Sequence, residues 1–437
     1  MTNTINIFWF RRDLRLTDNK GLFEALKGQI KVLPIFIFDS EILEMLPKDD
    51  PRVSFIYETL EEINIILQED YGSSIQIYFG TPLEVYHQLN THYKIETVYT
   101  NHDYEPYARQ RDAEIKTFLE QNNIAFKTYK DQVIFEKDDI VKSDGTPYLV
   151  YTPYMKRWKA QFKTENIKSF PSETLLKHFV QHQKVEAPTL LNMGFESTKQ
   201  RIAPYLATPE VIQNYETTRN FPAQDSTSKL GPHLRFGTVS VRYMISKAVS
   251  ETNHVFWQEL IWREFFMQIL WHFPQTQTKS FKPQYDRIVW RNNEAEFKAW
   301  CEGKTGYPFI DAGMRQLNQT GFMHNRVRML VGSFLCKHLL IDWRWGEAYF
   351  AEKLHDYEMA SNIGNWQWVA GCGVDAAPYF RIFNPTTQIQ KFDKDLKYIN
   401  TWVPEYQEFT YPKPIVDHAA ARERCLRVFK AALNASI

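Results

Sequence analysis

Short apolar runs alternate with longer stretches of helical periodicity over residues 1–131. The amphipathic stretches include Val53–Leu67 and Glu105–Leu119. This alternation is typical of a parallel sheet that is covered by helices on both faces. The sequence therefore predicts a Rossmann-like parallel α/β domain at the amino terminus. The five expected strands are Ile5–Phe10, Val32–Phe38, Ile75–Phe79, Thr97–Thr100 and Ala125–Tyr129.

The turn after the first expected strand contains no glycine-rich phosphate loop. It reads RRDLRLTDN and lacks G-x-G-x-x-G, and no G-x-x-x-x-G-K-[ST] pattern occurs anywhere in the chain. Asp18 or Asn19 is a suitable N-cap for the helix that follows. We therefore expect that this domain does not bind a dinucleotide by the usual phosphate-loop route.

Strand signals nearly disappear in the second half of the chain. Periodicity weakens over residues 132–191, and we expect an interdomain connection there. Helical spacing then returns, so residues 192–437 are predicted to form a larger, mostly helical domain. The overall prediction is an α/β domain followed by an all-α domain. Segments with helical spacing and caps include Val255–Leu270, Pro308–Leu317, His324–Leu340 and Glu347–Leu354.

Composition excludes several classes of protein. The 52 basic residues balance the 52 acidic residues, so nucleic-acid binding requires a local basic surface rather than a net positive charge. The cysteines match neither a zinc-ligand spacing nor a disulfide framework, and we expect no metal and free thiols. No signal peptide or membrane-spanning run is present, so a soluble cytoplasmic protein is expected. The cysteines are Cys301, Cys336, Cys372 and Cys425.

Aromatic, arginine and amide side chains are concentrated in the helical half. Such side chains suit a stacked base, a flavin or both. Glu259, Trp262 and Arg263 are spaced at i, i+3 and i+4, so they share one helical face, although core packing with a surface ion pair is also consistent. Asn325 and Arg326 begin another helix, and this pairing is common in sites for bases and phosphates.

Five motifs occur in a fixed order along the chain. They are FWFRRDLRLTDN, LIWREFF, WCEGKTGYPFIDAGMRQLNQTGFMHNRVRM, SFLCKHLLIDWRWG and NWQWVAGCGVDAAPYFRIFNPTTQ. Together they resemble the photolyase/cryptochrome family, and in particular the class I cyclobutane pyrimidine dimer photolyases. The resemblance extends from the first strand to about Tyr406. It implies an α/β antenna domain and a carboxy-terminal helical domain that binds FAD in a folded conformation.

The resemblance implies a set of flavin-binding residues. Asn362 would face N5 of the flavin, where an amide can form a hydrogen bond. Lys229 and Gly231 depart from the usual Thr-Ser-Arg-Leu-Ser segment, and Glu358 stands where Asp is more usual. The residues implied for FAD are Tyr215, Thr227, Ser228, Lys229, Leu230, Gly231, Arg328, Asp356, Glu358 and Asn362.

The resemblance also implies a reaction on UV-damaged DNA. Trp366, Trp343 and Trp290 match an electron-transfer chain that reduces photoexcited FAD, and the excited reduced flavin would then split a dimer held by Glu259. Photolyases are themselves an established example of enzymes that flip a base out of the duplex. The residues implied to contact the dimer or the DNA are Glu259, Trp262, Arg263, Asn325, Arg326, Met329, Gln367 and Trp368.

Neighbouring branches of the family match less well. A (6-4) photolyase would have histidines where this chain has Asn325 and Met329, and a DASH-type protein would have tyrosines in place of the two pocket tryptophans. A cryptochrome-type photoreceptor with little repair activity is the alternative, although it would usually carry Asp at Asn362. Tyr107 and Ala108 replace the Asn-Glu pair of folate-binding members. A second, antenna chromophore is therefore possible, but its identity stays open. A monomer is expected.

Overall fold

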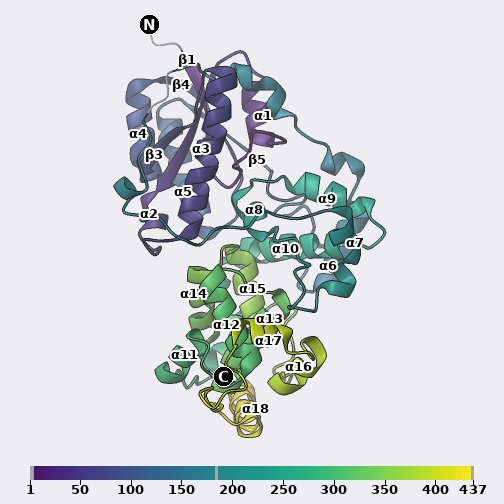
Figure 1. The fold of residues 1–437 in the computed structure, drawn as a ribbon. Coiled ribbons are helices and arrows are strands. Elements are labelled where there is room, and N and C mark those ends of the chain that lie inside the picture. The colour runs from purple at the N-terminus through teal and green to yellow at the C-terminus, as the bar shows by residue number, and fades with distance from the viewer. Residues whose placement is uncertain (1–3, 183–185, 435–437) are drawn as a thin grey trace. The chain divides into compact units, whose positions relative to one another are not determined.

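The computed structural model describes residues 4–182 and 186–434, and Figure 1 shows the order of its elements. The chain divides into two compact units. Unit 1 comprises Met1–Glu136, Gln161–Tyr205 and Leu230–Ser250, and unit 2 comprises Lys137–Ala160, Leu206–Lys229 and Glu251–Ile437. The expected boundaries at residues 131 and 191 separate consecutive blocks. The compact units are instead interleaved along the chain, because two later segments pack with the amino-terminal one.

Unit 1 contains a five-stranded parallel sheet with the strand order β3-β2-β1-β4-β5. Alternate residues of the central strand enter two separate hydrophobic clusters, Phe8 and Phe10 on one face and Ile7 and Trp9 on the other. Burial on both faces explains the uninterrupted apolar runs, and the predicted α/β fold is confirmed. The strands are β1 (Thr4–Phe10), β2 (Val32–Asp39), β3 (Gln76–Gly80), β4 (Lys94–Asn101) and β5 (Ala125–Tyr129).

The first four helices of unit 1 begin at polar side chains that accept a backbone hydrogen bond. Asn19 rather than Asp18 is the N-cap of α1, and its side-chain oxygen accepts a hydrogen bond from the backbone of Leu22 at 3.1 Å. The helices of unit 1 are α1 (Lys20–Leu26), α2 (Ser40–Leu43), α3 (Pro51–Tyr71), α4 (Pro82–His92), α5 (Pro106–Gln121), α8 (Gly231–Phe236) and α9 (Val241–Ser250), with 3-10 turns at Thr164–Ile167, Ser172–His178 and Leu191–Met193.

Unit 2 is helical, as predicted. The helix expected over His324–Leu340 is α13 followed by a π-helical turn, Phe334–Leu339. The helix expected at Glu347 begins earlier, because Asp342 accepts from the backbone of Arg344 at 3.0 Å and caps it. The helices are α6 (Tyr151–Gln161), α7 (Pro209–Thr218), α10 (Val255–His272), α11 (Glu294–Cys301), α12 (Pro308–Thr320), α13 (Asn325–Ser333), α14 (Trp343–Lys353), α15 (Met359–Ala370), α16 (Pro385–Phe392), α17 (Lys397–Trp402) and α18 (His418–Asn434), with 3-10 turns at Pro274–Gln277 and Pro283–Arg287.

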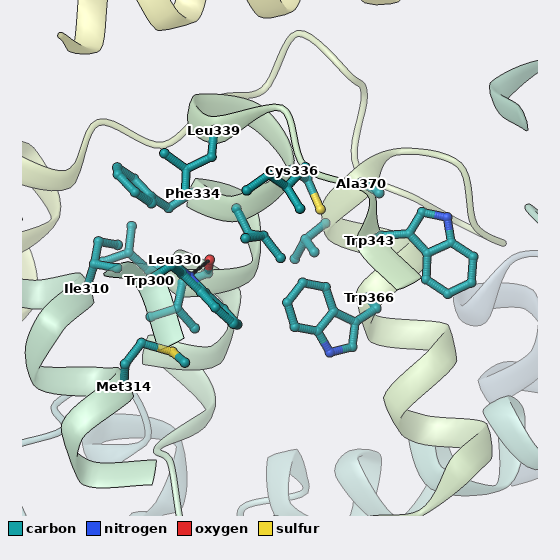
Figure 2. Close-up of a cluster of buried hydrophobic side chains, with 14 of the residues drawn as sticks. Trp300, Ile310, Met314, Leu330, Phe334, Cys336, Leu339, Trp343, Trp366 and Ala370 are labelled. Carbon is teal, nitrogen blue, oxygen red and sulfur yellow. Dashed lines mark hydrogen bonds between the residues drawn. The ribbon is translucent and has the colours of Figure 1, made fainter. Parts of the chain in front are cut away.

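A cluster of buried aromatic and aliphatic side chains forms the core of unit 2 (Figure 2). Trp300, Trp343 and Trp366 all belong to it, and Trp366 lies between the other two in the view of Figure 2. Gly346 of α14 permits this packing, because a Cβ atom at that position would overlap the ring of Trp366 and approach Leu335 to 2.6 Å. The helix that begins at Trp343 therefore fits closely against α15.

The same core buries an imidazole that should make stability depend on pH. The rings of His338 and His418 are hydrogen-bonded at 2.8 Å, and burial lowers the pKa of His338 to about 3, an effect to which His418 and Arg424 add. In the unfolded chain this residue takes up a proton near pH 6.5, whereas the folded chain keeps it neutral. The contribution of neutral His338 to the free energy of unfolding is therefore fully present above about pH 6.5 and is lost as the pH falls toward 3.

We expect this one residue to cost the wild-type protein about 2 kcal/mol of unfolding free energy between pH 7 and pH 5. In the His338→Gln variant, the free energy of unfolding should not show this part of the decrease. Urea unfolding at the two pH values, monitored in wild type and variant, measures the difference. An identical pH dependence in both proteins would contradict the assignment.

Three of the four cysteines are buried, and all four are free thiols. Within residues 4–182 and 186–434, no group of His, Cys, Asp or Glu side chains has the arrangement of a metal site. Among the helices in those same ranges, none combines the length and the apolar character that crossing a bilayer requires.

Candidate functional site

One cavity of about 380 Å³ lies within unit 2. It is formed where α15 packs against α10 and α13, with α7 and α14 contributing further side chains. Residues spaced three or four apart on each helix face it, such as Glu259, Trp262 and Arg263 on α10 and Asn362 and Trp366 on α15. The residues implicated by sequence that line this cavity are Tyr215, Glu259, Trp262, Arg263, Asn325, Arg328, Met329, Asp356, Glu358, Asn362, Trp366 and Trp368.

Two arginine–carboxylate pairs line the cavity. Arg328 binds Asp356 through both of its terminal nitrogens, at 3.1 and 2.8 Å. Arg263 donates from Nε to Oε2 of Glu358 at 2.8 Å, with both side chains largely buried. Charges in such a place require a partner, because desolvation of an isolated charge is costly. The longer Glu358 side chain therefore completes an ion pair here although Asp is more usual at its position.

A third pair joins Glu259 to a residue that sequence reasoning missed. Nη1 of Arg219 lies 2.6 Å from Oε1 of Glu259. Burial raises the pKa of Glu259, and the nearby Arg219 guanidinium acts in the opposite direction. Arg219 follows Tyr215 by four residues, and its guanidinium lies 5.2 Å from the centre of the Tyr215 ring. That i, i+4 spacing from a predicted flavin residue is the signal that could have indicated it.

Asn362 is held by the partly buried carboxyl group of Glu347. Its side-chain nitrogen donates to the backbone oxygen of Glu347 at 3.1 Å and to Oε1 of Glu347 at 2.9 Å. Burial raises the pKa of Glu347, while the hydrogen bond from Asn362 lowers it. Because both N–H groups of the amide are used, the Asn362 side-chain oxygen is the atom left for a ligand.

The three predicted electron-transfer tryptophans pack in the same hydrophobic cluster. Trp366 lines the cavity, and its ring contacts those of Phe350 and Trp300, with centroids 4.9 and 6.2 Å away. Trp343 is almost fully buried, and Trp290 is partly buried beside Phe429. The order of the three in an electron path stays a prediction.

Gln367 is not brought to the cavity. It is buried, and its two N–H groups donate to the backbone oxygens of Thr276 and Lys279 at 2.9 and 3.0 Å. Its side-chain oxygen accepts from the backbone of Phe281 at 2.8 Å. Helical rotation turns Gln367 away from the face that carries Trp366. The side chain therefore serves interior packing rather than a DNA surface.

Two other groups of predicted residues also lie outside the cavity lining. Arg326 donates to Asn220 at 2.5 Å and lies over the ring of Phe392, and no carboxylate in the described part of the chain forms an ion pair with it. In the segment Thr227–Gly231, which the resemblance implies for FAD, Lys229 adopts a positive φ of 51° and pairs with Asp225 at 2.9 Å. The rest of that segment is Thr227 and Ser228 in unit 2 and Leu230 and Gly231 in unit 1.

Two family models match the chain. One, described as DNA photolyase, covers residues 6–174, and the other, described as the FAD binding domain of DNA photolyase, covers residues 256–410. The second contains most of the cavity. The groups that line the cavity fit a flavin, since an amide oxygen, paired guanidinium and carboxylate groups and aromatic planes surround one space. FAD is therefore the cofactor of this domain.

Relatives match over nearly the whole chain. The deoxyribodipyrimidine photo-lyase of Synechococcus sp. is 36% identical over 98% of this chain and 96% of its own length. The crystal structure of a bacterial class III photolyase from Agrobacterium tumefaciens superimposes with a TM-score of 0.88 at 34% identity, covering 100% of this chain and 99% of the other. An archaeal photolyase from Sulfolobus tokodaii, solved with two FAD molecules, gives a TM-score of 0.80 at 34% identity over 98% and 100% of the two chains. The chain belongs to the DNA photolyase family.

Proposed function

We propose that this protein uses light to repair cyclobutane pyrimidine dimers in UV-damaged DNA. Family membership supports light-dependent DNA repair, and one observation supports the finer assignment. The same cavity is lined by the residues implied for the flavin, such as Asn362 and Arg328, and by those implied for the dimer, such as Glu259 and Trp262. Electron transfer between a cofactor and a substrate is favoured when the two lie close together, and one shared cavity allows that.

Within the cavity, polar groups orient the cofactor. Reduced FAD supplies, when bound, the light-driven electron transfer that splits the dimer. The Arg328–Asp356 and Arg263–Glu358 pairs offer fixed charges to the ring system, and the side-chain oxygen of Asn362 offers an acceptor. Because these groups are already held by partners, they need little rearrangement when the flavin binds.

The dimer side of the cavity combines apolar walls with a polar anchor. Trp262 and Trp368 present flat indole surfaces, and Glu259 and Asn325 present hydrogen-bonding groups for base edges. A dimer stacks and pairs poorly, so extruding it costs less than the few kcal/mol needed for an intact pair. This difference favours selection of damaged over intact DNA.

The chain has no net charge, so binding to DNA requires a local cation, and Arg326 is a candidate. Arg326 follows Asn325 directly and has no carboxylate partner within residues 4–182 and 186–434. Burial lowers its pKa, as do the nearby cations Arg219 and Arg381. A phosphate of the DNA backbone would relieve that repulsion, so Arg326 is proposed to bind the strand next to the dimer.

The direct test is illumination of the FAD-loaded, chemically reduced protein with oligothymidine that contains thymine dimers. We expect restoration of thymine absorbance under blue light and none in the dark. A dimer-free oligothymidine controls for light-induced changes in the DNA or the flavin. If flavin is bound and light restores no thymine, the cryptochrome-type photoreceptor becomes the better assignment. The absorption spectrum of the same sample reports any second chromophore.

A further inference from the structure

One face of the cavity tryptophan Trp262 is covered by a tyrosine from α6. The rings of Tyr151 and Trp262 are stacked, with centroids 3.5 Å apart and planes inclined by 9°. Tyr151 is buried, whereas Trp262 is partly exposed and lines the cavity. A change of the Trp262 side-chain rotamer would therefore break this stack.

A second contact fixes Tyr151 on the same helix. Its hydroxyl donates to the backbone oxygen of Gln258 at 2.7 Å. Gln258 and Trp262 are four residues apart on α10, so ring and hydroxyl bind one face of that helix, one turn apart. Gln258 also directly precedes Glu259. The stack and the hydroxyl contact together therefore hold the turn of α10 that carries Trp262.

A third contact connects Tyr151 to the segment after α15. The backbone N–H of Tyr151 donates to Oδ2 of Asp375 at 3.1 Å. Asp375 has a φ of 47°, a conformation that Asp tolerates better than most residues. It lies in the loop that follows the end of α15 at Ala370, and Trp368 is on the last turn of that helix. The first residue of α6 therefore connects α10, which carries Trp262, to the loop that follows α15, which carries Trp368.

We propose that Tyr151 is a positioning residue that holds Trp262 in place and sets the slot between Trp262 and Trp368 for the pyrimidine dimer. The inference rests on the proposed repair function and adds a residue that acts through Trp262 rather than on the dimer. Walls that are fixed before binding lower the ordering cost of taking up the substrate. We expect loss of Tyr151 to change dimer binding and not flavin binding, because none of the Tyr151 contacts described above involves a flavin-binding residue.

The test uses FAD-loaded protein and dimer-containing oligothymidine. We expect Tyr151→Leu to raise Kd and KM for the dimer about three- to tenfold, the effect of losing an aromatic pair. The turnover at saturating dimer and the flavin absorption spectrum should not change. Tyr151→Phe keeps the stacked ring and should restore most of the affinity. In a Trp262→Leu background, Tyr151→Leu should add no further loss, because its effect passes through the indole.

The matched control is Tyr154→Leu. Tyr154 is buried on the same helix and contacts Phe265, with centroids 5.2 Å apart, so its loss perturbs α6 without uncovering Trp262. Equal losses of dimer affinity in the Tyr151→Leu and Tyr154→Leu variants, or additive losses in the double variant, would overturn the proposal. A wild-type protein that neither binds nor repairs the dimer would instead refute the proposed function.

Discussion

Light-driven reduction of oxidised FAD should be abolished in a Trp366→Phe variant, while repair by the chemically reduced protein should persist. Trp366 is the tryptophan of the predicted path that lines the cavity. Its indole can give up an electron, whereas the phenyl ring of phenylalanine is far harder to oxidise. Repair starts from flavin that is already reduced and does not need this path. Bleaching of flavin absorbance under blue light measures the first property, and thymine restoration after chemical reduction measures the second.

Trp300 offers a control of similar chemistry in the same cluster. Its ring also contacts that of Trp366, it is fully buried, and its indole donates to the backbone oxygen of Val331 at 3.1 Å. We expect Trp343→Phe to slow photoreduction and Trp300→Phe to leave it unchanged. The opposite result would place the path through Trp300. Equal loss of photoreduction and repair in Trp366→Phe would instead indicate damage to the flavin site.

The fold was predictable where burial produces a local pattern. Strands that are buried on both faces appear as apolar runs, and the helices of unit 2 carry apolar residues at helical spacing. The interleaving of the compact units depends on long-range packing, which periodicity does not report. Helix α6 lies in the stretch interpreted as a connection. Its buried residues Tyr151, Tyr154 and Trp158 have helical spacing, but nothing local indicates which helix they contact.

The site was predictable where motifs carry it, and incomplete where a partner is distant in sequence. Arg219 meets Glu259 across 40 residues, and Tyr151 meets Gln258 across 107. Neither pair has a sequence spacing from which the contact could be derived. Gln367 shows the opposite error, because it is adjacent to Trp366 in the motif but lies on another face of α15. The place of a residue in a motif predicts that it lies near the site. The helix face on which the residue lies decides whether its side chain enters the cavity.

Removing the Glu259 carboxylate should weaken dimer binding strongly and leave the flavin in place. In Glu259→Ala the dimer loses a hydrogen-bond acceptor, and Arg219 loses the carboxylate that lies 2.6 Å away. A hydrogen bond to a charged group contributes enough that we expect Kd for dimer-containing oligothymidine to rise about ten- to hundredfold. Titration of the oligonucleotide, with the flavin spectrum recorded in parallel, measures both effects.

Two companion variants separate the causes of that loss. Glu259→Gln keeps an acceptor of similar shape, and Arg219→Met removes the guanidinium while leaving the carboxylate. If the dimer needs only an acceptor, the Gln variant should bind better than the Ala variant. If the ion pair positions Glu259, the Met variant should lose affinity too, although it removes no predicted dimer contact. Release of FAD from Glu259→Ala would contradict both readings, because Glu259 would then belong to the cofactor side of the cavity.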